Sequence, residues 1–400
     1  MHKWFVTILC ASGIVDQIIK DFGISMEVAT LMISLFVAGY CVGPIFWGPL
    51  SEEFGRRPVF IGFQIGMAKL ADNTASLLIF RFIGGAFAAC PLTNSGAVIS
   101  DIWDTRTRGK AIAIFAVAPF SRACPRTYSC RIYICVSWCW LFCVLTIFAG
   151  VCWVLIIVAI PETYRTLAQQ VTHVLTRKPM LMASTLYLSF VYGCVYILFE
   201  AYPIVFTEGH GFNAGISGLM FLPVMLGSIT AVIGYLIIWH PRYEKEMARC
   251  APDPVAPEYR LHMTMYASPL FAVSLLTDVI FQFPSVSYWA PLMAGYAMGF
   301  AISWIFLSFL NYIIDTYLMV AASALAANTV CRSLFGAAFP LFATLGAHLA
   351  SSLLGFIALA MVPLPLLFIK YGHILRMKSK YAPTRRLSVA LSKESDKTVA

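Results

Sequence analysis

Charged residues are scarce in this chain of 400 residues: Asp, Glu, Lys and Arg make up 12% of it, whereas 60% is hydrophobic. About a quarter of a soluble globular protein is charged, so this composition argues against a soluble fold. Apolar runs of about 20 residues, each long enough to cross the hydrocarbon layer of a membrane, recur along the chain. The sequence therefore predicts an all-α membrane protein.

Several functional signatures are missing. The sequence contains no glycine-rich phosphate-binding loop, no zinc-binding helix motif and no nucleophile elbow, so we expect no ATP hydrolysis and no enzymatic reaction. Its 12 cysteines lie mostly within apolar segments and lack the spacing of metal ligands or a disulfide framework. The net charge of +9 resides in short loops and the tail, without the basic stripe of a nucleic-acid interface. We expect no catalytic residues, no metal, no cofactor and no nucleic-acid partner.

Nine apolar segments predict membrane-spanning helices. They are Ala29–Trp47, Ser76–Ser100, Trp138–Ile160, Leu181–Phe206, Ala214–Trp239, Ser268–Phe283, Tyr288–Leu310, Leu318–Leu345 and Ser351–Ile369. Three weaker candidates are Trp4–Val15, Val59–Ala71 and the first half of Ala111–Cys143. Together they predict about twelve spans, with both termini on the same side of the membrane.

Basic residues gather in alternate connections between these spans. One set comprises Arg56, Arg57, Arg106, Arg108, Lys110, Arg165, Arg177, Lys178, Arg242, Lys245, Arg249 and Arg260. The tail extends this set, whereas the other connections hold little beyond Lys20 and Lys69. Because basic loops remain in the cytoplasm, both termini are predicted to be cytoplasmic.

A short charged segment divides the chain near its middle. We predict an N-terminal six-helix half over residues 1–160, a cytoplasmic linker over 161–179 and a C-terminal six-helix half over 180–371. Residues 372–400 are predicted to form a basic, disordered cytoplasmic tail.

The most specific motif is the charged turn Gly48-Pro49-Leu50-Ser51-Glu52-Glu53-Phe54-Gly55-Arg56-Arg57-Pro58. Its glycines permit a tight turn between two helices. The pattern G-x-L-S-[DE]-x-x-G-R-R-P resembles the loop between spans 2 and 3 of major facilitator superfamily transporters. Further stretches resemble the drug:proton antiporter branch, particularly fungal polyamine and multidrug exporters: Phe80–Gly85, Pro91–Gly96, Pro161–Tyr164, Phe199–Phe206 and Asn311–Asp315.

This resemblance implies a major facilitator fold of two six-helix halves around a central site. It also implies secondary active export of polyamines, drugs or other organic cations by alternating access, with a proton gradient in place of a cofactor. The expected partners are the organic cation, protons and the lipid bilayer. We expect a monomer, located in the plasma membrane rather than the vacuolar membrane.

The candidate gating residues lie within the charged turn, except Asp101, which lies at the cytoplasmic end of predicted span 4. They are Gly48, Glu52, Gly55, Arg56, Arg57 and Asp101. Glu52 and Arg56 lie about one helical turn apart and can form an ion pair, while Asp101 is a candidate partner for either arginine. The alternative is a solvated loop that only fixes the orientation of the chain. Asp315 is expected to mirror these charges in the C-terminal half.

Four polar residues within predicted spans are candidates for the substrate or proton pathway: Arg81, Glu200, Asn328 and Arg332. An ionisable group within the membrane must face a polar cavity or reach the interface. For Arg81, the resemblance implies proton coupling, and the alternative is a side chain that extends outward to water. Glu200 either exchanges a proton for a cation or lies at the interface. Asn328 and Arg332 either line the pathway or form hydrogen bonds between helices.

The chain departs from the family pattern in spans 1, 3 and 5, which we expect to be defective. Trp4–Val15 and Val59–Ala71 are too short to cross ~30 Å of hydrocarbon. Ser121–Arg131 places three arginines where span 5 is otherwise apolar, at a cost of roughly 2.5–3.5 kcal/mol each. The chain therefore resembles a truncated family member, and the alternative function is that of a degraded or mis-spliced product that does not transport.

A local frameshift is our hypothesis for these arginines. When the stretch is back-translated and read one nucleotide later, it permits Gly-Pro-Ala-Leu-Gly-Pro. That sequence is similar to the G-P-x-x-G-P motif that antiporters of this superfamily carry in span 5. Genomic reads that show one uninterrupted exon, without a reading frame for the motif, would refute the hypothesis.

Overall fold

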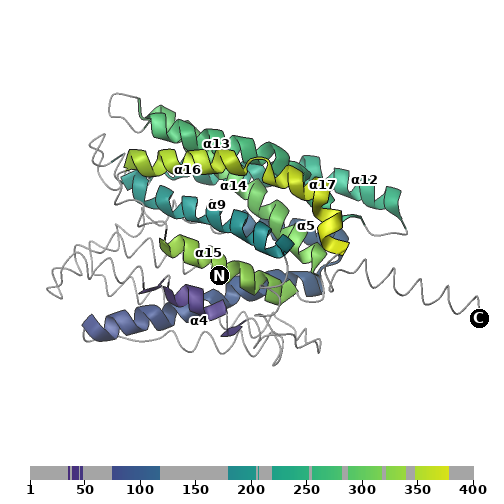
Figure 1. The fold of residues 1–400 in the computed structure, drawn as a ribbon, viewed down its shortest axis with the longest axis horizontal. Coiled ribbons are helices and arrows are strands. Elements are labelled where there is room, and N and C mark those ends of the chain that lie inside the picture. Colours follow the sequence, from purple (N-terminus) through teal and green to yellow (C-terminus); the bar gives the residue numbers. More distant parts are fainter. Residues whose placement is uncertain are drawn as a thin grey trace, which may run out of the picture.

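The computed structural model describes residues 35–36, 38–44, 46–47, 74–117, 179–203, 206, 219–251, 255–281, 287–317, 321–338 and 347–377. Nearly all of these residues are helical, and no strand occurs among them, so the predicted all-α class is confirmed (Figure 1). The labelled elements are α4 (Thr74–Ile102), α5 (Thr105–Val117), α9 (Pro179–Pro203), α11 (Leu222–Gly234), η3 (Tyr235–Trp239), α12 (His240–Cys250), η4 (Pro257–Leu261), α13 (His262–Phe281), α14 (Trp289–Thr316), α15 (Ala321–Ala338), α16 (Ala347–Met361) and α17 (Leu364–Met377).

The helices of the C-terminal half form a bundle, and several of its described members contact the N-terminal half. Helix α14 packs against α11 and α13, and α15 lies between α9 and α4 (Figure 1). On the N-terminal side, α5 contacts α14, α11 and α12. Among the described residues, the contact between the halves therefore runs mainly along α14 and α15, with smaller contributions from α11 and α12.

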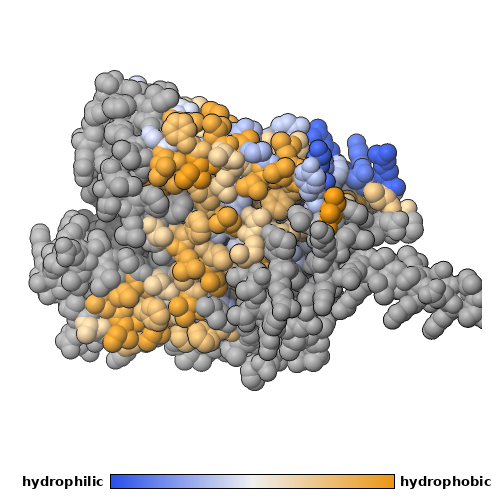
Figure 2. All heavy atoms as spheres, viewed as in Figure 1, coloured by the Kyte–Doolittle hydropathy of each residue, from blue (hydrophilic) through white to orange (hydrophobic). Residues whose placement is uncertain are grey.

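Four helical stretches among the described residues are long and apolar enough to cross a membrane. They are Met180–Leu198, Leu222–Cys250, Trp289–Thr316 and Ser352–Gly372. Large apolar side chains point outward from them, including Ile237 and Phe356, which are 69% and 65% exposed. Hydrophobic residues cover much of the described surface, whereas hydrophilic ones gather at one end, over α12 (Figure 2). Such a surface fits lipid better than water, as predicted for a multi-pass membrane protein.

One predicted helix boundary is wrong. The helix that was expected to end at Trp239 continues through η3 and α12 to Cys250, because charged Arg, Glu and Lys side chains end its apolar surface but are good helix formers. The segment Ser351–Ile369, predicted as one span, agrees with the candidate span Ser352–Gly372, within which Val362 and Pro363 form a turn between α16 and α17. Pro363 lacks the backbone N–H that a continuous helix needs there.

Small residues bring α11 and α14 into backbone contact. A Cβ atom added to Gly299 would overlap the main chain of Val224, and one added to Gly227 would overlap the carbonyl of Tyr296. Trp304 Nε1 donates a hydrogen bond of 2.7 Å to the Ala231 carbonyl across the same interface. Close backbone approach of this kind holds helices together in lipid, where the hydrophobic effect does not.

The three spans expected to be defective lie largely outside the described residues. The same is true of the linker up to residue 178 and the tail from residue 378. The predicted defects and domain boundaries there stay predictions.

Candidate functional site: a charged network between the halves

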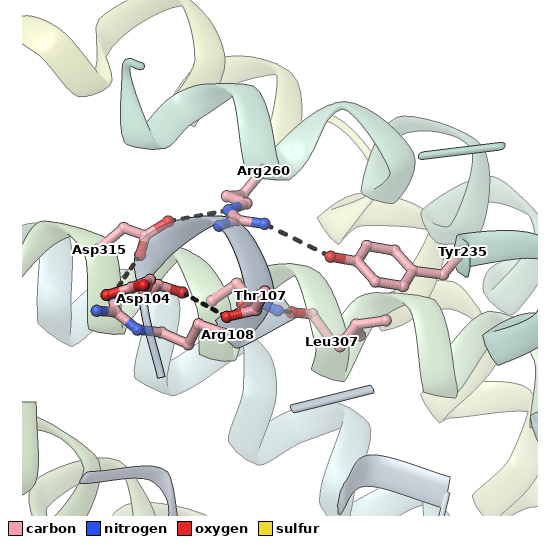
Figure 3. A network of polar contacts seen from close by, with 8 residues as sticks. Asp104, Thr107, Arg108, Tyr235, Arg260, Leu307 and Asp315 are labelled. Atoms are coloured by element: carbon pink, nitrogen blue, oxygen red, sulfur yellow. Dashed lines mark hydrogen bonds and ion pairs between the residues drawn. The ribbon is translucent and has the colours of Figure 1, made fainter. Parts of the chain in front are cut away.

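Three charged residues from separate segments meet at the end of the molecule where α4 ends and α5 begins, here called the basic end. Arg108 Nη1 in α5 lies 3.1 Å from Asp315 Oδ1 in α14. Arg260 Nε in η4 lies 2.9 Å from Asp315 Oδ2, so each carboxylate oxygen accepts from a different guanidinium (Figure 3). These side chains are only 6%, 4% and 9% exposed for Arg108, Arg260 and Asp315. A buried carboxylate between two guanidiniums forms strong, charge-assisted hydrogen bonds.

A tight turn between α4 and α5 positions Arg108. The carbonyl of Asp104 accepts hydrogen bonds from the amides of Thr107, at 3.0 Å, and Arg108, at 2.8 Å. The Thr107 hydroxyl also donates to this carbonyl, at 3.4 Å (Figure 3). The next residue, Gly109, allows α5 to approach its neighbours closely, because an added Cβ would overlap the Tyr235 hydroxyl. That Cβ would also lie 3.0 Å from Arg260 Nη1.

Two tyrosines hold Arg260 in place. Its guanidinium carbon lies 3.6 Å from the ring centroid of Tyr243, a cation–π contact. Its Nη1 atom donates to the Tyr235 hydroxyl at 3.5 Å. Burial acts to lower the pKa of Arg260, but Asp315 and the two tyrosines outweigh it and raise that pKa above its ordinary value. Arg260 is therefore charged at every physiological pH.

Tyr235 stands in a π-helical turn. The turn η3 interrupts the long helix formed by α11 and α12, and Pro241 follows directly in the first turn of α12. Turns of this type insert one residue into a helix and often occur at functional sites. In this molecule Tyr235 in the turn and Tyr243 in α12 both contact Arg260.

A second ion pair lies farther out. Arg106 Nε in α5 lies 2.9 Å from Glu244 Oε1 in α12. Glu244 Oε1 also lies 3.3 Å from Nε2 of the buried His240. Because the Arg106 side chain is 65% exposed, solvent and salt screen this pair far more than the inner one. We call Arg106, Arg108, Glu244, Arg260 and Asp315 the latch.

The space beside the latch is small. A cavity of about 20 Å³ lies beside Arg260. It is lined by Tyr235, Trp239, Tyr243, Tyr259, Arg260, Met263, Leu307, Ser308 and Asn311. Within the described part of the chain, Ser308 Oγ and Asn311 Oδ1 in this lining have no hydrogen-bond partner. A volume of this size admits one water molecule and no organic substrate.

The predicted gating residues are only partly described. Gly48, Glu52, Gly55, Arg56 and Arg57 lie outside the described residues. Asp101 belongs to the last turn of α4, but its side chain is not described. Their gating role therefore stays a prediction.

The predicted pathway residues lie deeper in the bundle. Arg81 is buried in α4, and Asn328 and Arg332 are buried one turn apart in α15. Glu200 lies in the last turn of α9, and its side chain is outside the description. The structure brings Asn328 and Arg332 onto one helix face, and their role in transport stays a prediction.

Of the three buried latch residues, Arg108, Arg260 and Asp315, only Asp315 was identified as a candidate from the sequence. Asp315 was expected to mirror the gate charges, and it does pair with an arginine of the other half. Arg108 and Arg260 were counted only among the basic loop residues that orient the chain. The glycine directly after Arg108 was the available signal of a close approach.

The family model of the Major Facilitator Superfamily matches residues 5–340. The chain belongs to this superfamily. Its curated relatives include Efflux pump FUB11 of Gibberella moniliformis, 38% identical, with 93% of this transporter and 70% of the relative covered. The multidrug transporter mdrA of Aspergillus fumigatus is 36% identical, over 96% and 73% of the two chains. Multidrug transporter TPO1_2 of Candida glabrata is 35% identical, over 93% and 72%. These relatives are transporters, so the prediction of a non-enzyme is confirmed.

Solved structures show the same fold. The proton:xylose symporter XylE superposes with a TM-score of 0.66 at 15% identity, with 92% of this transporter and 94% of that chain covered. The human organic anion transporter MFSD10 superposes with a TM-score of 0.59, also at 15% identity, over 90% and 89%. At this identity the similarity concerns the fold alone.

The alignment with FUB11 also shows that internal residues are missing. It extends over 421 residues and covers 93% of this chain, which has only 400. The relative therefore contains residues, within the aligned region, that have no counterpart here. This finding agrees with the prediction that the chain is a truncated member of the family.

Proposed function

We propose that this transporter is an efflux pump that works by alternating access, and that the latch holds its cytoplasmic end closed. The observation that carries the proposal is the buried contact of Asp315 with both Arg108 and Arg260. An ion pair between two bodies forms only in the state in which they touch. Separating them breaks the charge-assisted hydrogen bonds of Asp315 with both guanidiniums, a loss that hydration of the exposed charges offsets in part. The cavity beside the latch, too small for a substrate, supports a closed state at this end.

The proposal also covers the ion that drives transport and the class of molecule that is transported. The words "efflux pump" and "multidrug transporter" in the names of the relatives support export of small organic molecules. We propose exchange for protons, with both termini in the cytoplasm and the plasma membrane as the location. An organic cation such as a polyamine is the cargo that the sequence favours, and Glu200 is its predicted binding residue.

One observation favours a second candidate function, that of a non-transporting family member. The relatives contain internal residues that this chain lacks, and Ser121–Arg131 carries three arginines within a predicted span. A helix with that composition inserts poorly into a membrane. A product of this kind would remain in the endoplasmic reticulum or be degraded.

Proteoliposome flux separates the two functions. The chain is expressed with a C-terminal fluorescent tag, checked for membrane insertion, purified and reconstituted into vesicles with an acidic lumen. We expect labelled spermidine or rhodamine dye to accumulate in the lumen as protons leave, and accumulation to stop when an ionophore removes the pH gradient. An inserted, monodisperse protein that moves neither compound, beside an active FUB11 control, would support the second function.

A further inference from the structure

A buried arginine at mid-depth in the bundle carries the inference. Arg332 in α15 is 5% exposed. Its guanidinium carbon lies 4.7 Å from the ring centroid of Tyr192 in α9 and 5.8 Å from that of Phe306 in α14. Aromatic rings from two neighbouring helices, α9 and α14, therefore contact this charge.

Among the described residues, Arg332 differs from Arg108 and Arg260 because no carboxylate accompanies it. Arg108 and Arg260 both pair with Asp315, whereas Arg332 forms no ion pair within the described residues. Its Nε atom is buried without a hydrogen-bond partner in that part of the chain, and so is Oδ1 of Asn328, one turn earlier. A buried charge without a partner is costly, so this site favours an anion that comes from outside the chain.

The surroundings of Arg332 favour a flat apolar group. The rings of Tyr192 and Tyr196 lie 5.1 Å apart at an interplanar angle of 61°, and their hydroxyls are 3.2 Å apart. Gly336, one turn after Arg332, lies against both rings, because an added Cβ would lie 3.2 Å from Tyr192 and 3.1 Å from Tyr196. Aromatic rings of this kind can stack with planar ligands.

The cluster also reaches the N-terminal half. Tyr40 lies close enough to Arg332 and Tyr192 to interact with both electrostatically. Helix α15 itself lies between α9 and α4, at the contact of the two halves (Figure 1). Phe306 precedes Asp315 on α14 by nine residues, which places the cluster roughly 14 Å deeper than the latch.

We propose that Arg332, Tyr192, Tyr196 and Phe306 bind an aromatic carboxylate, which adds organic anions to the cationic cargo proposed above. The carboxylate accepts hydrogen bonds from the guanidinium, and the ring of the ligand stacks against the tyrosines and Phe306. An organic cation would instead meet a like charge in a medium of low dielectric constant. This inference rests on the proposed function in one respect, that cargo passes between the halves.

Equilibrium binding to the purified full-length protein in lipid nanodiscs tests the site. The probes are benzoate, its neutral analogue benzamide and the cation benzylammonium, each measured by calorimetry. We expect benzoate to bind at least about tenfold more tightly than either analogue. Arg332→Gln is expected to weaken benzoate binding by about tenfold to a hundredfold and to leave benzamide binding unchanged. Arg332→Lys is expected to retain part of the preference for benzoate.

A matched control replaces the exposed Arg249, whose side chain is 82% exposed on α12. Arg249→Gln is expected to bind all three probes as the wild type does. Binding of benzamide by Arg332→Gln shows that this variant is folded. If the variant does not fold, the order of the wild-type affinities for the three probes tests the inference by itself. Equal affinity for benzoate and benzamide, or a preference for benzylammonium, would overturn the inference.

The result also separates this inference from the proposed function. A protein that moves spermidine or rhodamine in vesicles but does not bind benzoate refutes the anion site alone. A protein that binds benzoate through Arg332 but moves none of the probes refutes the proposed transport alone.

Discussion

Arg108 and Asp315 are 207 positions apart in the sequence, and their side chains lie 3.1 Å apart in the structure. One belongs to the N-terminal half and the other to the C-terminal half. Arg260, which is 55 positions from Asp315, occupies the second carboxylate oxygen at 2.9 Å. A single carboxylate thus joins three segments at the basic end, and its removal affects both arginines at once.

Asp315→Asn is expected to lower the stability of the closed state more than any other single change in the latch. The substitution removes the charge of Asp315 from two buried guanidiniums, and breaking a buried pair in this way costs roughly 3–5 kcal/mol. Thermal unfolding in nanodiscs measures the loss, and vesicle flux reports the effect on transport. Asp104→Asn is the matched control, because the Asp104 residue is exposed and contributes its main-chain carbonyl to the turn. Equal unfolding midpoints for the two variants would contradict the role of Asp315.

Arg108→Gln and Arg106→Gln form a second pair of variants, two residues apart on the same helix. Arg108 is buried against Asp315, whereas Arg106 is largely exposed beside Glu244. We expect Arg108→Gln to lower the unfolding midpoint and the rate of flux, and Arg106→Gln to change either one little. Added salt is expected to abolish any effect of Arg106→Gln, because ions screen exposed pairs. Similar losses from both variants, independent of salt, would show that burial does not distinguish the two ion pairs.

Gly109→Ala tests the close approach of α5 to Arg260 and Tyr235. The added Cβ overlaps the Tyr235 hydroxyl, and overpacking of this kind costs about 1–3 kcal/mol. We expect a lower unfolding midpoint and altered flux. Gly84→Ala in α4 is the control, because no atom lies within 4 Å of its added Cβ. That variant is expected to be neutral or slightly stabilising, since alanine is the better helix former. A neutral Gly109→Ala would mean that α5 need not approach so closely.

Gly299→Ala tests the contact between α11 and α14. Its Cβ overlaps main-chain atoms of Val224, which cannot move as a side-chain end can, so we expect the helices to separate and the protein to lose stability. At Gly234, by contrast, an added Cβ would lie 3.4 Å from the ring of Trp304, an ordinary contact. Gly234→Ala is therefore expected to be tolerated. Unfolding midpoints of both variants in nanodiscs provide the comparison, and a tolerated Gly299→Ala would refute the packing argument.

The sequence predicted the helices better than their ends. Apolar runs identified α4, α9 and α14, because the need to pair backbone groups in lipid makes every such run a helix. The extension to Cys250 was missed because hydropathy reports where a helix leaves lipid, not where its hydrogen bonds end. Pro363 was visible in the sequence, but an apolar run on both sides of it concealed the break between α16 and α17.

The latch could be predicted only in part. Asp315 stood out because a carboxylate beside an apolar run is rare and costly. Nothing in the spacing of Arg108, Arg260 and Tyr243 indicated that they would share that carboxylate, since their contacts depend on how α5, η4 and α12 pack. The π-helical turn that presents Tyr235 has no sequence signature that we recognised.

The sequence by itself determined that this protein lies in a membrane and belongs to a transporter family, because apolar length and the charged turn are local properties of the chain. Only the tertiary structure decided which charges have partners. Arg108 and Arg260 share Asp315, whereas Arg332 contacts aromatic rings, with no carboxylate beside it among the described residues. The reason is physical: the free energy of a buried charge depends on the groups within a few ångströms of it, and helix packing selects those groups from distant parts of the sequence.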